Sequence, residues 1–140
     1  MHDLNKSGLE NVCREFAIAF HGVLSWTWDS RFDTALAEFF IDNKDAVRAT
    51  VERYLSIVWD SSNIGKASDI VQMIANHLGG LRSGQLLFVS DPKQDVFIYG
   101  VWWPWGDGKT ISFRVAPYAK RLSDAEMTEL TTLFKGWFGL

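Results

Sequence analysis

The residues of this 140-residue chain whose types can act in catalysis form no recognised catalytic motif. Cys13 needs a base beside it to act as a nucleophile, but it falls on an apolar stripe between Val12 and Phe16. A cysteine in that position is expected to be a small buried hydrophobe. The histidines are not spaced as metal ligands, and the chain has no Cys-x-x-Cys pair that could complete a metal site with them. We therefore expect no metal and no cofactor at His2, His21 or His77.

Two other patterns have the composition of a functional motif without its full spacing. Asn63–Ala67 resembles the end of a phosphate-binding loop, but Asp60 replaces a glycine, Ala67 replaces Ser or Thr, and no strand is expected before it. Paired acids such as Asp29 and Asp33 have the chemistry for acid–base catalysis. Acids at helix starts are also favoured by the helix dipole. We expect a protein that is not an enzyme; catalytic residues assembled from distant segments are the open alternative.

Tryptophan is the unusual feature of the composition, with seven copies in the chain. Trp102, Trp103 and Trp105 surround Pro104 in a segment that is expected to be a strand. Because successive strand residues point to opposite sides of a sheet, Trp102 is expected to face one way and Trp103 and Trp105 the other. Pro104 cannot donate to a ladder, so we expect it at a strand end or a bulge. Which side of this strand is buried stays open.

Composition and cysteine use favour a globular cytoplasmic protein. The contents of 47% hydrophobic and 22% charged residues exclude a disordered chain, and the length predicts a single domain over 1–140. The lone cysteine fits a reducing compartment. Residues 1–6 are polar and do not read as a signal peptide, and no apolar run approaches the ~20 residues of a membrane span. We expect a cytoplasmic chain without a membrane partner.

Apolar residues at helical spacing predict four helices in residues 1–84. Capping residues and a glycine pair mark some of their ends. The helices are Gly8–Leu24, opened by a capping box of Ser7 and Glu10; a short helix with Phe32, Leu36, Phe39 and Phe40; a helix from Asn43 with Val47, Val51, Tyr54, Leu55 and Val58; and a helix with Ile70, Val71, Ile74 and Leu78, closed by Gly79 and Gly80.

From Gln85 the pattern changes to extended segments rich in β-branched and aromatic residues. Three runs separated by short turns, 86–89, 96–105 and 110–115, predict an antiparallel meander. Ser123 and Glu126 then form a capping box that opens a C-terminal helix. The predicted fold class is therefore α+β, with a helical part over 1–84 followed by a three-stranded antiparallel meander and a C-terminal helix over 85–140.

The motif L-S-x-x-W-D-S occurs twice, at Leu24–Ser30 and Leu55–Ser61. Each copy is expected to close a helix, with Trp28 or Trp59 sealing its end and the following Asp turning the chain. A helical duplication would explain this pattern. Coincidence explains it as well, since the residues after the two copies do not align and two units are fewer than a solenoid needs.

Charge favours a protein partner over a nucleic acid. The net charge is −3, and five acids lie between positions 29 and 45 against two bases. Such a patch would repel phosphates and favour a basic partner, although a solvated helix face is the explanation that we prefer. Arg114, Lys120 and Arg121 are too few for a nucleic-acid groove, so no nucleic acid is expected.

These observations predict a non-catalytic protein-binding domain, because a surplus of exposed aromatic surface implies a partner or a pocket. The specific hypothesis is a bacterial immunity-type protein or antitoxin that inhibits a toxin or enzyme by occluding its surface. One alternative is a small-molecule-binding domain with a Trp-lined pocket between sheet and helices, to which Arg114 or His77 supplies polar groups; another is self-association. The predicted partner-binding residues are Trp103, Trp105, Tyr99, Asp29, Asp33, Asp42 and Asp45.

Overall fold

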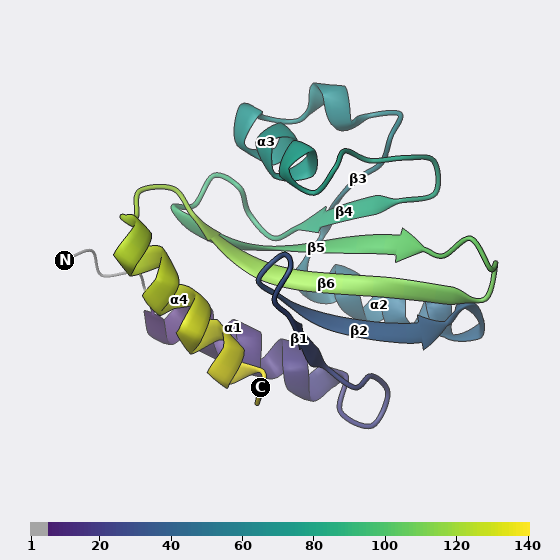
Figure 1. Ribbon diagram of the computed structural model, residues 1–140, viewed down its shortest axis with the longest axis horizontal. Helices are drawn as coiled ribbons and strands as arrows, with labels where there is room; N and C mark the ends of the chain where they lie inside the picture. Colours follow the sequence, from purple (N-terminus) through teal and green to yellow (C-terminus); the bar gives the residue numbers. More distant parts are fainter. Residues whose placement is uncertain (1–5) are drawn as a thin grey trace.

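A single antiparallel sheet organises the computed structural model, which describes the backbone of residues 6–140 and the side chains of residues 8–140 (Figure 1). Within this part of the chain the sheet has six strands in the order β1-β2-β6-β5-β4-β3, and the helices are distributed between the strands. The prediction of a helical part followed by a three-stranded sheet is therefore wrong. Three of the six strands come from residues 1–84, which were expected to be helical.

Helices and strands are interspersed along the described chain. The helices are α1 (Lys6–Ala19), α2 (Lys44–Tyr54), α3 (Asp69–His77) and α4 (Asp124–Trp137), and the short 3₁₀ turns are η1 (Ile41–Asn43) and η2 (Ile64–Lys66). The strands are β1 (Thr27–Asp29), β2 (Thr34–Phe40), β3 (Ile57–Trp59), β4 (Leu86–Val89), β5 (Val96–Pro104) and β6 (Thr110–Ala119).

The predicted short helix around Phe32–Phe40 is instead the hairpin of β1 and β2. Asp33, at a φ of 54°, lies in the turn, and Ala35, Ala37 and Phe39 are buried on one side of β2. The helical spacing of the large apolar residues concealed this alternation, because two of the three inward positions are alanines. Pairing of β2 with β6 over six residue pairs decides the conformation, and this pairing is not local.

Two helix ends were also misplaced. The first helix ends at Ala19 rather than Leu24, and Gly22, at a φ of 81°, helps to reverse the chain before β1. α2 ends at Tyr54, and the residues after it leave the helix to pair with β4 as β3. In both cases apolar residues beyond the helix end extended the periodic pattern: Phe20 and Leu24 lie in the connection to β1, and Val58 lies in the edge strand β3. The Ser7 side chain of the expected capping box lies outside the described side chains.

The later elements agree with the sequence. β4, β5 and β6 are adjacent in the sheet as the expected meander. The amide of Glu126 donates to Ser123 Oγ at 3.2 Å while Glu126 Oε1 accepts from the Ser123 amide at 3.2 Å, which is the predicted capping box of α4. Gly79 and Gly80, with φ of 93° and 81°, follow α3 as expected.

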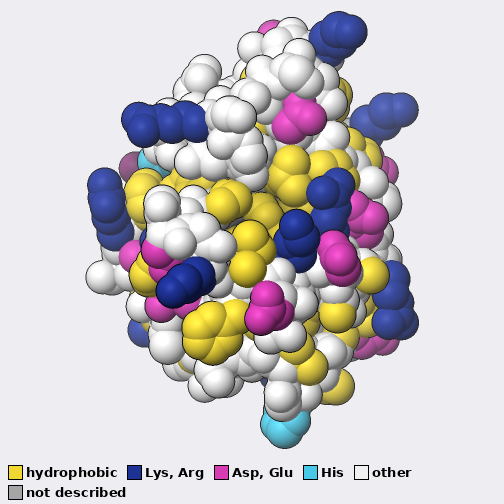
Figure 2. Space-filling view, turned by 90° about the vertical axis from the view of Figure 1, so that its right-hand side faces the viewer, with side chains coloured by type: hydrophobic (Ala, Val, Ile, Leu, Met, Phe, Trp, Pro, Cys, Tyr) yellow, Lys and Arg dark blue, Asp and Glu magenta, His cyan; other side chains and the backbone are white. Residues whose placement is uncertain are grey.

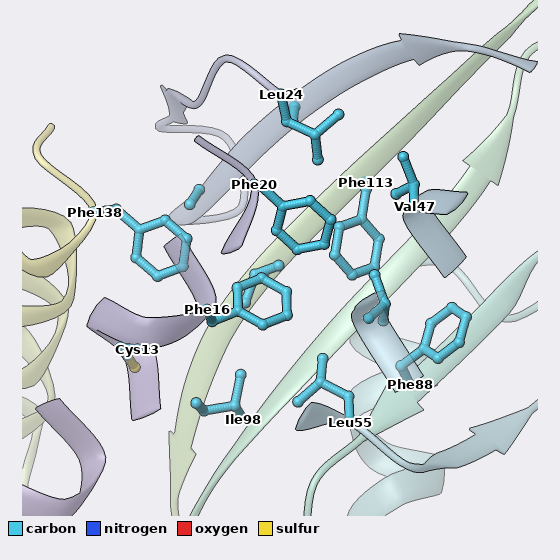
Figure 3. Close-up of a cluster of buried hydrophobic side chains, with 14 of the residues drawn as sticks. Cys13, Phe16, Phe20, Leu24, Val47, Leu55, Phe88, Ile98, Phe113 and Phe138 are labelled. Atoms are coloured by element: carbon cyan, nitrogen blue, oxygen red, sulfur yellow. The ribbon is translucent and has the colours of Figure 1, made fainter. Parts of the chain in front are cut away.

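Hydrophobic clusters cover the two faces of the sheet. The larger cluster joins one face to α1, α2 and α4, and Figure 3 shows the rings of Phe16, Phe20 and Phe113 gathered near its centre. The smaller cluster joins the other face to α3, chiefly over β4 and β5. Both sides of the sheet are thus used for packing, but only part of the α3 face is covered by a helix.

The two copies of the L-S-x-x-W-D-S motif each contain an edge strand, β1 or β3. Asp29 Oδ1 accepts from the Arg31 amide at 3.1 Å, and Asp60 Oδ1 accepts from the Ser62 amide at 2.9 Å, so both aspartates turn the chain as predicted. The tryptophans do not seal helix ends, because both lie on strands. Trp28 packs against the larger cluster and Trp59 against the smaller, so the copies differ structurally at this position.

Candidate functional site

The tryptophans of β5 lie on both faces of the sheet. Trp102 is buried in the larger cluster and contacts Phe39 edge-on, with ring centroids 5.3 Å apart. Trp103 packs against the smaller cluster on the opposite face and is half-buried. The side on which α1, α2 and α4 pack is therefore fully covered at this point, whereas the Trp103 side is partly open.

Trp105 lies just beyond Pro104, which is the last residue of β5, as the sequence predicts for a proline in this sheet. Its backbone amide donates to the Thr110 carbonyl at 2.8 Å, and its indole Nε1 donates to Ser112 Oγ at 2.6 Å. The side chain nevertheless remains 45% exposed. Ser112 lies opposite Trp103 in the sheet register, so Trp105 is held in place on the Trp103 side.

Arg114 is fixed beside Trp103 by an ion pair and two rings. Its Nε donates to Asp29 Oδ2 at 2.8 Å, and the two side chains are only 16% and 13% exposed. The guanidinium carbon lies 4.6 Å from the ring centroid of Trp103 and 5.6 Å from that of Phe32. Planar stacking and a carboxylate partner are the contacts that suit a guanidinium group. This cluster ties the β1–β2 turn to the face of β5 and β6.

These residues line a hollow of about 410 Å³ between the β1–β2 turn, the sheet and the segment that follows α3. We call it the Trp103 hollow. Figure 2, which views the end of the molecule where β5 turns into β6, shows hydrophobic side chains gathered in the middle of the face with charged side chains around them. The lining residues are Arg31, Phe32, Glu38, Leu78, Gly79, Gly80, Arg82, Gln85, Trp103, Trp105, Ser112 and Arg114.

Phe40 extends this face beyond the hollow. It is 69% exposed, and it lies opposite Thr110 in the register of β2 with β6. Strand alternation places it on the same side of β2 as Glu38, which lies opposite Ser112. The Trp103 hollow and Phe40 together form what we call the docking surface.

Only part of the predicted set of partner-binding residues lies here. Trp103 and Trp105 line the hollow, and Asp29 is engaged by Arg114. Tyr99 is only 8% exposed, and burial, with a smaller effect of Asp33, raises the pKa of its phenol to about 12. Its side chain belongs to the core rather than to a contact surface.

The predicted acidic patch is divided. Asp33 is exposed in the β1–β2 turn, whereas Asp42 lies in η1 and Asp45 in the first turn of α2. None of these three lines the Trp103 hollow. Acids at the start of α2 are favoured there by the helix dipole.

Sequence reasoning missed several residues of the docking surface. Phe40 was assigned to a helix, and Phe32, Arg31 and Arg82 were not connected with the tryptophans. The local sequence offered little signal for β2, because Glu38 is the one polar residue between Ala35 and Phe40 and no polar–apolar alternation marks its outward side. Nothing local in the sequence brings Arg31 and Arg82 to one hollow.

Among the residues considered for catalysis, Cys13 lies in the core, whereas His21 and His77 lie at the surface. Cys13 is buried, and desolvation raises the pKa of its thiol to about 12. His21 and His77 are exposed, and His77 does not line the Trp103 hollow. Within residues 8–140, no group of three or more His, Cys, Asp or Glu side chains could hold a metal ion. His2 lies outside the described residues.

The segment resembling a phosphate-binding loop does follow a strand, β3, contrary to expectation. Asp60 Oδ1 accepts from the amide of Asn63 at 3.1 Å and from that of Ser62, just before the segment, at 2.9 Å. The amides of Ile64, Lys66 and Ala67 donate to backbone carbonyls of the protein. Asn63 Oδ1 in turn accepts from the Asp60 amide at 2.7 Å. The Asp60 carboxylate thus takes the position in which a phosphate-binding loop would bind an anion with its amides.

A second hollow, of about 630 Å³, is lined by residues at the opposite ends of β5 and β6 and by the start of α1. It contains none of the tryptophans, although Tyr54, Phe97 and Leu122 contribute to its wall. None of the predicted partner-binding residues lies there.

Over the described residues, no helix has the length and apolar character needed to cross a membrane. The chain matches no protein-family model, and neither the curated proteins nor the solved structures contain a match to it.

Proposed function

We propose that this chain is a protein-binding domain that uses the docking surface to occlude part of its partner. The observation that supports this is the exposure of two large rings, Phe40 at 69% and Trp105 at 45%, beside a hollow lined by Trp103. Aromatic side chains of this kind contribute most of the binding energy in protein interfaces. The hydrogen bond from Trp105 to Ser112 holds one ring in position before binding, which lowers the entropic cost of association.

The specific form of the proposal is an immunity-type antagonist that acts in the cytoplasm on a toxin or enzyme. A preformed binding face suits occlusion: Phe40 and Trp103 are held by strands, and Trp105, just beyond β5, is held by its bond to Ser112. The buried thiol of Cys13 is compatible with a reducing compartment. The arginines around the hollow do not favour the basic partner that the acids of the sequence suggested.

The experiment is partner capture with matched surface variants. Phe40→Ser and Trp105→Ser remove the exposed rings of the docking surface, while Ile18→Ser removes a side chain of α1 that is 70% exposed and lies outside that surface. We expect a partner that is retained by the wild type and by Ile18→Ser to be lost with Phe40→Ser and Trp105→Ser. The captured protein should lose its own activity when the wild-type chain is added.

Equal capture by all the folded variants would contradict the use of this surface. Capture that depends on the docking surface but does not change the activity of the partner would contradict the antagonist role. The chain would then be a protein-binding domain without an inhibitory function. Circular dichroism of each variant establishes that it is folded before capture is compared.

A small-molecule-binding domain is the second candidate, and the volume of the Trp103 hollow favours it. Ligand sites commonly measure about 300–1,000 Å³ and combine aromatic walls with a few polar groups. The hollow of about 410 Å³ offers Trp103, Trp105 and Arg114 for that purpose. A change in tryptophan fluorescence on adding a metabolite library, lost in Trp105→Phe, would support this candidate.

A further inference from the structure

We infer that the partner presents an acidic segment to the Trp103 hollow, with carboxylates at Arg31 and Arg82 and an apolar side chain against Trp103 and Trp105. This inference rests on the proposed protein-binding function and specifies the chemistry of the partner. It reverses the sign of the partner charge that the sequence suggested.

The charge around the hollow differs in sign from that of the whole chain. Three arginines line it against one acid, Glu38, while the chain as a whole carries a net charge of −3. A local excess of one sign beside an apolar centre favours a partner segment of the opposite sign.

The three arginines are not equivalent. The Nε atom of Arg114 lies 2.8 Å from Asp29 Oδ2, so its charge is neutralised, and the side chain is largely buried beside the ring of Trp103. Arg114 therefore forms part of the wall of the Trp103 hollow. Arg31 and Arg82 are exposed, and neither has an ion-pair partner within 4.0 Å among the described residues. These two guanidinium groups are therefore available for carboxylates of a partner.

Arg31 and Arg82 are presented by separate segments that the fold holds in defined conformations. The guanidinium carbon of Arg31 lies 4.9 Å from the ring centroid of Phe32, and its amide is bound by Asp29. The amide of Arg82 donates to Gln85 Oε1 at 2.9 Å, which closes the turn before β4. One arginine therefore belongs to the β1–β2 turn and the other to the segment after α3.

The expected contribution of these charges is mainly to orientation and association rate. Ion pairs at the rim of an interface are screened by salt and add little affinity, whereas aromatic contacts at its centre add more. The inference therefore predicts binding whose association rate falls with ionic strength and whose dissociation rate depends on Trp105.

The test is selection of random displayed peptides on the immobilised whole chain. We expect enrichment of peptides that carry Asp or Glu next to an aromatic or aliphatic residue. Their affinity should fall at least tenfold on Arg31→Glu/Arg82→Glu, because the reversed charges repel the peptide acids and slow association, and it should recover when the peptide acids are replaced by lysine. Arg53→Glu/Lys93→Glu is the matched control, since both residues are exposed, line neither hollow and give the same change in net charge.

The outcomes separate this inference from the proposed function. Selection of peptides without an excess of acids, whose binding is lost in Phe40→Ser or Trp105→Ser, would contradict the acidic partner. It would still support the use of the docking surface for protein binding. Peptides that bind all variants equally, or no enrichment at all, would count against both. Tighter binding of a single-stranded oligothymidylate than of the acidic peptides would also overturn the inference, because stacked bases and phosphates would then be the better occupants.

Discussion

Gly100 shows how closely the core is packed at the centre of the sheet. A Cβ atom built on this residue would lie 2.5 Å from Cζ of Phe113 and 3.2 Å from Cδ1 of Leu55. Phe113 is fully buried and contacts the rings of Phe88 and Trp102. The missing side chain at position 100 therefore makes room for an aromatic cluster that joins β4, β5 and β6.

We expect Gly100→Ala to lower the free energy of unfolding by roughly 1–3 kcal/mol, the usual effect of overpacking a core. Gly136→Ala is the matched control, because the residue is in α4 and its added Cβ would meet no atom within 4 Å apart from its chain neighbours and the nearby backbone of its own helix. At that position alanine should raise stability by up to about 1 kcal/mol through helix propensity. Urea unfolding of both variants measures the effects, and equal stabilities would contradict the packing argument.

Thr34 is a second residue whose environment predicts a measurable effect. Its Oγ1 is buried and has no hydrogen-bond partner, although the residue is fully inaccessible to solvent. We expect Thr34→Val to raise the free energy of unfolding by about 1 kcal/mol, since a buried unsatisfied hydroxyl is costly.

The same substitution at Thr110 provides the control for Thr34→Val. The Thr110 hydroxyl donates to Asp107 Oδ2 at 2.9 Å, so Thr110→Val removes a hydrogen bond and should not stabilise the protein. Thermal melts of the two variants give the comparison. A loss of stability in Thr34→Val would show that its hydroxyl has a partner, such as a bound water.

At the scale of elements, aspartate turns connect the strands. Asp107 Oδ1 accepts from the amides of Lys109 and Thr110 at 2.8 and 3.0 Å in the β5–β6 turn. The bond from Lys109 is the main cause that lowers the pKa of Asp107, and the side-chain bond from Ser62 has the same effect on the pKa of Asp60. Both carboxylates are thus favoured in their ionised form by the folded chain.

This arrangement predicts a loss of stability in acid. A carboxylate whose pKa is lower in the folded state contributes stability above its unfolded pKa of about 3.9, and that contribution is lost as pH falls through the folded pKa. We expect Asp107→Asn to be less stable than the wild type at pH 6 and the difference to shrink below pH 4. Urea midpoints across this range measure it, and a difference that is independent of pH would contradict the role of the charge.

At the scale of the whole molecule, the larger cluster unites segments from both ends of the chain. Cys13 on α1 is buried in this cluster together with Phe134 and Phe138 from the C-terminal segment, and desolvation raises the pKa of its thiol to about 12. Reaction of such a thiol requires exposure of the core.

Cys13 should therefore report global unfolding. At pH 8 we expect its labelling by a disulfide reagent to be slow in the native protein and to follow the unfolding rate, because both α1 and α4 must separate to expose it. Ellman's reagent with and without denaturant provides the measurement. Rapid labelling of the native chain, without loss of circular dichroism, would show that α1 detaches on its own.

The sequence by itself determined the local features of this protein. Helix α3 with its glycine pair, the capping box at Ser123 and Glu126, and the alternation that separates Trp102 from Trp103 depend on neighbouring residues and are confirmed. These features follow from capping, turn chemistry and strand geometry, which operate over a few positions.

Only the tertiary structure decided the three strands within residues 1–84 and the docking surface. Residues 34–40 become β2 because β6, about 75 positions later in the chain, pairs with them, and this pairing turns Phe40 outward. Arg31 and Arg82 reach one hollow because the β1–β2 turn and the end of α3 meet over the same face of the sheet. Strand pairing over long separations depends on the whole chain, so local periodicity does not specify it.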